Sequence, residues 1–166
     1  MFVAPPGYQP VYNPCIPYVG PIYGGLRSGM SVYIQGVIPH KITSFHINLQ
    51  CGESEGSDVG FHFSPRFDSW DKVVFNSCQE GKWGSEEETH HMPFSKGDAF
   101  EMVIIINQEG YQACTPYSLM IPGGMCTIRR TQSAIRGMVP LGANRCFYPL
   151  GKPAGSGIAV KRAALL

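Results

Sequence analysis

The sequence predicts an all-β domain, built as a sandwich or barrel of short antiparallel strands. Short alternating or apolar segments recur at regular spacing between residues 31 and 107, and turn-forming Gly, Asp and Ser residues separate them. No segment in this region shows convincing helical periodicity. With 166 residues, the chain is long enough for one domain with a sizeable core.

The expected strands are assigned from alternation and from their β-branched and aromatic residues. The segments SVYIQGV and FHINL alternate between apolar and polar side chains, which is typical of half-buried strands. Turn segments such as CGESEGSD and FSKGD separate one strand from the next. In chain order, we expect strands at residues 31–37, 45–49, 59–63, 72–76, 83–89 and 99–107.

A segment rich in proline and tyrosine precedes the strands. Residues 1–25 hold six prolines, four glycines and four tyrosines. Because proline removes a backbone donor and fixes φ, we expect a flexible, extended arm rather than a packed element. The arm could be a simple tether or a surface for self-association, and its composition favours the tether.

The end of the chain differs from the rest in charge and in pattern. Residues 1–112 carry twelve acidic and six basic residues, whereas residues 113–166 carry seven basic residues and no acidic ones. Prolines and glycines recur too often there for long strands. We expect a divergent basic tail, largely irregular, with a short helix at 160–166. Its basic pairs lack interleaved aromatic residues, so we expect no nucleic-acid partner.

The cysteines and the N-terminal sequence indicate the cellular compartment in which we expect the protein. The six cysteines form no C-x-x-C pair, which argues against a zinc ribbon or a thioredoxin-like motif. The N-terminus lacks the features of a signal peptide, and the chain has no N-x-[ST] acceptor. We therefore expect free thiols and a cytoplasmic protein. No apolar run is long enough for a membrane helix, so we expect no membrane insertion.

A cluster of polar residues lies on three successive expected strands. In FHFSPRF, the period of two places His62, Ser64 and Arg66 on one face, although Pro65 interrupts the pattern of an ordinary strand. Asn76 follows on the next strand. The third expected strand adds a tryptophan and two carboxylates, namely Trp83, Glu86 and Glu88.

This set of side chains suits the recognition of a sugar. Arg, His, Asn and Glu bind hydroxyl groups through hydrogen bonds, of which the charge-assisted ones are strongest. A tryptophan ring packs against the apolar C–H face of a pyranose. A neighbouring glutamate can hold the planar guanidinium of an arginine in place. We therefore interpret the cluster as a candidate carbohydrate site.

The order and spacing of these motifs resemble the galectin carbohydrate-recognition signature. FHFSPRF, VVFN and KWGSEE correspond to its H-x-N-x-R, V-x-N and W-x-x-E elements. The resemblance covers residues 1–112 and is closest to the N-terminal domain of a tandem-repeat galectin. It implies a jelly-roll β-sandwich of two antiparallel sheets that binds sugar without metal, cofactor or catalysis.

The resemblance also implies a role for each residue of the site. His62 and Arg66 would hold the 4-hydroxyl of galactose, and Trp83 would stack on the galactose ring. Asn76 and Glu86 would hold the 6-hydroxyl and its neighbours, with Glu86 also bracing Arg66. The implied partners are β-galactoside glycans on glycoproteins and glycolipids, and the implied second location is extracellular, by export that needs no signal peptide.

Two positions depart from the galectin pattern. Ser64 stands where the family has asparagine, so one galactose contact should be lost or bridged by water. The expected cost is on the order of 1 kcal/mol, or roughly fivefold in affinity. Glu88 stands where the family commonly has arginine or lysine, which should weaken contacts to a second sugar.

A third departure concerns the end of the domain. Galectins continue after the strand ending near Tyr111 with a V-x-V-N-G turn, an H-R-x-P segment and closing strands, and none of these motifs follows Gln112. We therefore expect residues 26–112 to form the N-terminal part of a galectin domain that is incomplete at its C-terminal end. Both sheets would then keep unpaired edges.

Three functions are compatible with these residues. The first is a lectin for β-galactosides, and the second is a galectin-fold protein with weakened or lost sugar binding that acts through protein contacts. Ser64 and Glu88 favour the second. A hydrolase using Glu86 and Glu88 ranks far below, because a salt-bridge network explains carboxylates beside an arginine better. The adjacent histidines at 90–91 point to opposite faces of a strand, so we expect no metal site.

Overall fold

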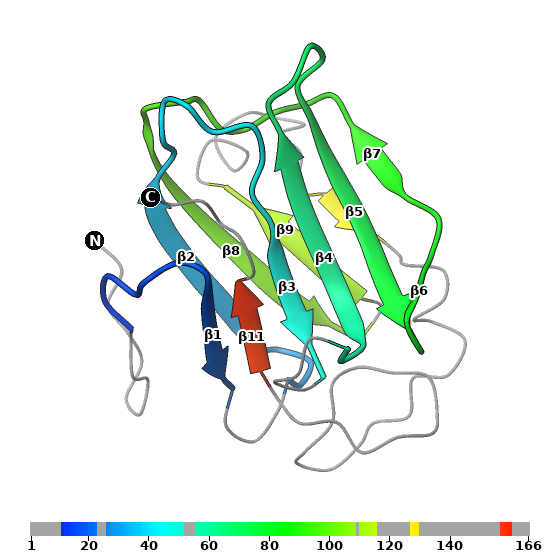
Figure 1. Cartoon of the computed structure of the whole chain (residues 1–166). Helices are drawn as coiled ribbons and strands as arrows, with labels where there is room; N and C mark the ends of the chain where they lie inside the picture. The colour runs from blue at the N-terminus through cyan, green and yellow to red at the C-terminus, as the bar shows by residue number, and fades with distance from the viewer. Residues whose placement is uncertain are drawn as a thin grey trace.

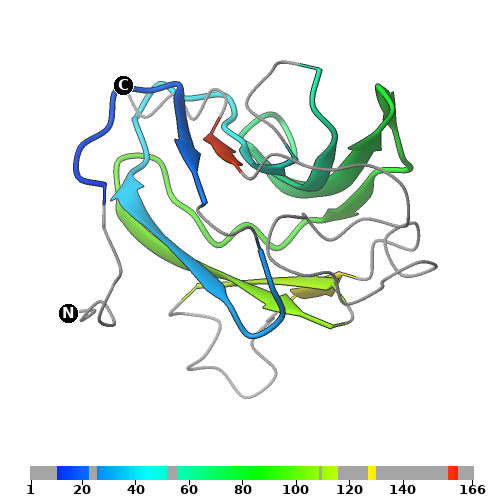
Figure 2. The same ribbon diagram turned by 90° about the horizontal axis from the view of Figure 1, so that it is seen from below.

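The computed structural model describes residues 11–22, 26–51, 56–108, 110–115, 127–129 and 157–160. Within these ranges the chain forms two antiparallel sheets and no helix. The sheets face each other as two layers (Figures 1 and 2). The all-β sandwich that the sequence predicts is confirmed.

The larger sheet carries the polar motifs. Its strands are β1 (Tyr18–Pro21), β3 (Ile47–Gln50), β4 (Val59–Arg66), β5 (Lys72–Gln79), β6 (Lys82–Trp83), β7 (Glu87–Thr89) and β11 (Gly157–Val160). They run in the order β1-β11-β3-β4-β5-β6, and β7 also pairs with β5. The three motif-bearing segments are therefore neighbours in space.

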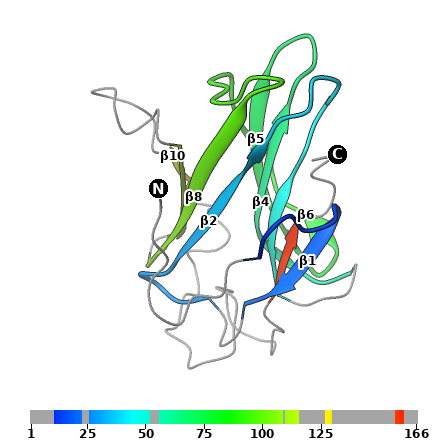
Figure 3. The same ribbon diagram turned by 90° about the vertical axis from the view of Figure 1, so that its left-hand side faces the viewer.

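The smaller sheet closes the sandwich on the other side of the core. Its strands are β2 (Ser31–Val37), β8 (Ala99–Asn107), β9 (Gly110–Cys114) and β10 (Thr127–Arg129), in the order β10-β9-β8-β2. This sheet is the lower layer of Figure 2. Its β2 edge lies on the same side of the molecule as β1 of the larger sheet (Figures 2 and 3).

The core between the sheets contains aromatic and aliphatic side chains, and each sheet supplies both kinds. Phe61 and Phe63 of β4 face inward with 1% and 3% of their surface exposed. Met102, Ile104 and Ile106 of β8 meet them from the smaller sheet, each at most 1% exposed. Because strand side chains alternate, burial of this face directs the intervening residues of β4 outward.

Strand β4 continues through Pro65, where the sequence suggested a break. The Pro65 carbonyl accepts a hydrogen bond from the Phe45 N–H (3.2 Å), and the ring is less than 2% exposed. The missing N–H is tolerated because β3 begins only at Ile47, so no regular strand lies beside Pro65 on that side. The alternation is unbroken, and Arg66 shares a face with His62.

Three segments differ from the sequence-based expectation. The strand expected at 83–89 is divided into β6 and β7, because the Gly84 N–H bonds to the Ser77 carbonyl (2.9 Å) and turns the chain. The arm contains a strand, β1, which pairs with β11. Both β10 and β11 lie inside the tail that was expected to be largely irregular.

The remaining predictions for the two ends fall partly outside the described residues. Val160 ends β11 rather than starting a helix, and residues 161–166 lie outside the described part. The same holds for residues 1–10 of the arm and for most of the tail. Cys114 is disulfide-bonded, contrary to the free thiols expected, whereas Cys15, Cys51 and Cys78 are free. No helix in the described ranges is long and apolar enough to cross a membrane.

Candidate functional site

The residues singled out by the sequence lie together on the outer face of the larger sheet. In the register of β4 and β5, His62 is opposite Asn76, and Arg66 is opposite Lys72. Strand β6 pairs with the end of β5 and places a tryptophan beside this face. The face presents the predicted site residues His62, Ser64, Arg66, Asn76, Trp83 and Glu86.

His62 is the centre of this face. Its ring packs edge-on against Trp83, with ring centroids 4.9 Å apart and an interplanar angle of 65°. Its Nδ1 lies 2.6 Å from Oδ1 of Asn48, the residue of β3 that is paired with His62 of β4. A neutral ring therefore donates Nδ1–H to Asn48 and keeps Nε2 as an acceptor for a ligand.

The surroundings of His62 favour this neutral form. Burial lowers the pKa of His62 from 6.5 to about 4, and the nearby His46 and Arg66 add to the effect, while Glu86 opposes it. The rings of His46 and His62 lie 5.5 Å apart. The acceptor at Nε2 is thus available throughout the neutral range of pH.

Arg66 supplies the donors beside that acceptor. Its Nη2 donates to Oε1 of Glu86 at 2.9 Å, and the two side chains are 33% and 48% exposed. An exposed ion pair adds little to stability. It does restrain the guanidinium, which has further N–H donors that a ligand can use.

Asn76 positions the tryptophan. It is 6% exposed, its Nδ2 donates to the Gly84 carbonyl (3.1 Å), and its Oδ1 accepts from the Ser77 N–H (2.8 Å). A Cβ at Gly84 would lie 3.2 Å from Asn76 Oδ1, so glycine allows this close approach. The neighbouring Trp83 is held with 53% of its surface exposed.

The two departures from the galectin pattern have different surroundings. Ser64 is buried, at 6% exposure, so its short side chain presents little surface to a ligand. Glu88 accepts from Lys72 Nζ at 2.7 Å, and this bond lowers the pKa of Glu88. Glu88 therefore has its own cation, and the pair lies beside that of Arg66 and Glu86.

Two residues of the face escaped the sequence analysis. Asn48 belongs to the segment FHINL. The alternation of this segment places Phe45, Ile47 and Leu49 on the inner face, so it also predicts that Asn48 faces outward. Lys72 precedes the motif VVFN and carries no signal of its own. Its role depends on the pairing of β5 with β7, which puts Glu88 within its reach.

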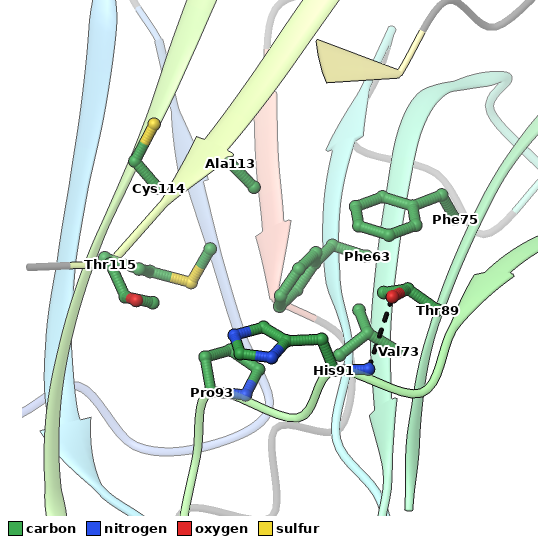
Figure 4. A pocket seen from close by; sticks show the side chains of 10 residues that line it. Phe63, Val73, Phe75, Thr89, His91, Pro93, Ala113, Cys114 and Thr115 are labelled. Carbon is green, nitrogen blue, oxygen red and sulfur yellow. Dashed lines mark hydrogen bonds between the residues drawn. The ribbon is translucent and has the colours of Figure 1, made fainter. Parts of the chain in front are cut away.

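A small cavity lies between the sheets and is separate from this face. Its volume is about 30 Å³, and aromatic residues of the larger sheet, including Phe63 and Phe75, line it together with residues of the smaller sheet (Figure 4). A cavity of this size is large enough for water and far too small for a sugar. In the same figure, the His91 N–H bonds to Thr89 Oγ1, and both residues line the cavity.

The described residues contain no group of three or more His, Cys, Asp and Glu side chains that could hold a metal ion. His90 and His91 are both exposed, and His90 Nε2 lies 3.9 Å from Oε1 of Glu88.

Comparison with known proteins assigns the chain to a family. The profile of the galactoside-binding lectins matches residues 17–145, which is more than half of the chain and extends beyond Gln112. The chain belongs to the galactoside-binding lectins. The galectin resemblance of the sequence motifs is thereby confirmed, and the match reaches into the segment expected to diverge.

Curated relatives of the chain include Galectin-4 proteins, in agreement with the predicted galectin likeness. Galectin-4 from pig and from human are each 60% identical to the chain over 111 residues, which is 67% of this chain and 34% of the relative. Human Galectin-7 is 42% identical over 98 residues, 59% of this chain and 71% of the relative. The chain thus spans about a third of the length of the Galectin-4 proteins that it matches.

Solved structures show the same sandwich. Chicken Galectin 2 aligns with a TM-score of 0.55 and 27% identity, over 61% of this chain and 74% of the other. Galectin-Ib from Xenopus laevis aligns with a TM-score of 0.58 over 86% of this chain and 89% of the other, at 20% identity. The predicted galectin-type jelly roll of two antiparallel sheets is confirmed.

Proposed function

We propose that this chain is a lectin that binds β-galactosides on the outer face of its larger sheet. The observation that carries the proposal is the pairing of a neutral histidine acceptor with fixed arginine donors beside an exposed tryptophan. His62 Nε2 can accept from a sugar hydroxyl while Arg66 donates to the same oxygen. A hydroxyl that donates to His62 and accepts from Arg66 must occupy one defined position. The pair therefore selects a sugar by the orientation of this hydroxyl as well as by its polarity.

Galactose fits this arrangement because its 4-hydroxyl is axial. That hydroxyl leaves one face of the pyranose, while the C–H groups at positions 3, 4 and 5 gather on the other face. An apolar C–H face can pack on the half-exposed ring of Trp83, and the axial oxygen then points toward His62 and Arg66. Glucose, with an equatorial 4-hydroxyl, cannot satisfy both contacts at once.

The carboxylates of the face support binding rather than catalysis. Glycosidases need one carboxylic acid whose pKa is raised and a second carboxylate opposite it. Here Lys72 lowers the pKa of Glu88, and Glu86 is engaged with Arg66. We infer no hydrolase activity. The proposed partners are galactose-terminated glycans of glycoproteins and glycolipids, and the proposed locations are the cytoplasm and the cell exterior, reached without a signal peptide.

A lactose-affinity column tests the proposal. We expect the folded full chain to be retained and to elute with lactose, but not with cellobiose, which differs at the 4-position of its terminal sugar. Clean flow-through of chain shown to be folded by a cooperative thermal transition would exclude the lectin function. It would favour the second candidate, a sandwich that acts through protein contacts, for which buried Ser64 is the supporting observation.

A further inference from the structure

A second ion pair lies beside the residues that are proposed to hold galactose. Lys72 Nζ donates to Oε2 of Glu88 at 2.7 Å, and the Lys72 side chain is 25% exposed. In the register of β4 and β5, Lys72 is opposite Arg66. The pair therefore adjoins the arginine that is proposed to bind the sugar.

The neighbouring strands β4, β5 and β7 arrange the side chains of this face in rows (Figure 1). Val74 of β5 is opposite Ser64 of β4 on one side and Glu88 of β7 on the other. Because every second residue of a strand shares a face, Asn76 and Lys72 lie on either side of Val74 along β5. The row of Glu88 therefore lies between that of Asn76 and that of Lys72.

Val74 is completely covered, although it lies on the outer face. The residues on either side of it along β5 belong to the core cluster, so Val74 points outward, yet its exposed fraction is 0%. Long charged side chains can cover an apolar neighbour with their stems while their charged ends stay near water. A stem that packs on the sheet has little freedom, and the ammonium at the end of Lys72 bonds to Glu88.

The charges at this end of the face balance. Arg66 and Lys72 contribute two positive charges, Glu86 and Glu88 contribute two negative ones, and each cation donates to one carboxylate. The bond to Lys72 lowers the pKa of Glu88, so this carboxylate is ionised throughout the neutral range of pH. Both cations are thus already paired before any ligand arrives.

A glycan that continues past Arg66 along β5 reaches the second ion pair. Trp83 is opposite Cys78 near one end of β5, and Lys72 begins the strand at the other end. These two positions are about 20 Å apart along an extended strand, which is longer than one sugar ring. A galactose on Trp83 covers only the first part, so a second unit on the Arg66 side meets Lys72 and Glu88.

We propose that Glu88 is a specificity-determining residue, which withholds the ammonium of Lys72 from acidic groups on the unit next to galactose. The inference rests on the lectin function proposed above. A carboxylate or sulfate of a ligand gains a charge-assisted hydrogen bond only from a donor that is free to make it. Because Glu88 occupies this donor, an acidic group on the second unit gives a glycan no advantage over a neutral one.

Two ligands with the same galactose test the inference. Lactobionate and lactitol both carry an open-chain unit next to galactose, and lactobionate ends this unit in a carboxylate where lactitol has a hydroxymethyl group. In calorimetric titrations, the wild type should bind lactobionate no more tightly than lactitol. Glu88→Gln keeps the size of the side chain and releases Lys72 from its carboxylate, so lactobionate should gain about fivefold over lactitol. The gain should shrink at high salt.

Two further variants separate the ammonium of Lys72 from other effects. Glu88→Gln combined with Lys72→Met keeps an apolar stem beside Val74 but removes the ammonium, so the gain for lactobionate should disappear. Glu101→Gln makes the same change of net charge on β8 of the smaller sheet, and should leave the ratio of the two affinities at its wild-type value.

The outcomes distinguish this inference from the proposed function. A wild type that already prefers lactobionate, or an unchanged ratio in Glu88→Gln while lactitol is still bound, would overturn the role of Glu88 and leave the lectin function standing. If the folded wild type bound neither ligand, the lectin function and the role of Glu88 would fail together.

Discussion

The two ends of the polar face are built by different forces. At the His62 end, burial and the bond to Asn48 hold a neutral ring in place, and the pKa of His62 falls to about 4. At the Glu88 end, exposed ion pairs hold the side chains, and the bond to Lys72 lowers the pKa of Glu88. Burial thus holds the His62 end in place. At the Glu88 end, a charged residue can be substituted without disturbing the sheet.

Substitution of Arg66, which links the two ends, should have the largest effect. Arg66→Ala removes the donors proposed for the sugar and leaves Glu86 without its cation. Hydrogen bonds to charged groups contribute about 1.5–3 kcal/mol each, so lactose affinity should fall by roughly a hundredfold or more. The check is a calorimetric titration, with Arg27→Ala, an exposed arginine before β2, as the control. Unchanged binding would refute the site assignment.

Loss of the tryptophan platform should be the next largest effect. Trp83→Ala removes the surface on which the sugar ring packs, and we expect affinity to fall by about tenfold to thirtyfold. Trp70 is the matched control, because it is also strongly exposed, at 79%, but lies in the turn after β4. Equal losses in the two variants would contradict the proposed stacking on Trp83.

The pH dependence of the free energy of unfolding should distinguish the buried His62 end from the exposed Glu88 end. The unfolded chain binds a proton at the ordinary histidine pKa of 6.5, whereas folded His62 does so only near 4. The free energy of unfolding should therefore decrease as the pH falls from about 6.5 toward 4, and be unaffected by this group above that range. His62→Gln should flatten this part of the curve, measured by chemical denaturation.

Lactose affinity should follow the folded-state pKa of His62. It should hold to about pH 5 and weaken as the ring gains a proton at Nε2 and loses its acceptor. If lactose affinity instead fell with a midpoint near pH 6.5, His62 would titrate like an exposed histidine, which would contradict its burial in the structure.

A gain is expected from restoring asparagine beside His62. Ser64→Asn adds a longer side chain with an acceptor and a donor, which should raise lactose affinity roughly fivefold through about one more hydrogen bond. Titration of both proteins under the same conditions measures the difference. No gain, with the fold intact, would show that position 64 is too deeply buried to contact the ligand.

The smallest effect is expected at the exposed ion pair. Glu88→Gln should leave lactose affinity nearly unchanged, because the pair with Lys72 is exposed and screened by salt. Titrations at low and high ionic strength check this expectation. A large loss on substitution would mean that Glu88 contacts the sugar itself and that the two ends of the face are equally constrained.

The sequence was sufficient to predict the face and the contact between Arg66 and Glu86, but not the other contacts within it. Alternation in FHFSPRF placed His62 and Arg66 together, and the same logic applied to FHINL would have added Asn48. The pair of Lys72 and Glu88 could not be predicted, because it depends on how β7 is registered against β5. Nor could the strand pairing of β1 with β11, since residues so distant in sequence carry no local signal of contact.

Calorimetric titration of the full chain with lactose and with cellobiose tests the central claim most directly. We expect lactose to bind at one site per chain and cellobiose to give no saturable heat, because only an axial 4-hydroxyl can meet His62 and Arg66 while the ring lies on Trp83. Equal binding of the two sugars, or no binding of lactose by folded protein, would contradict the account.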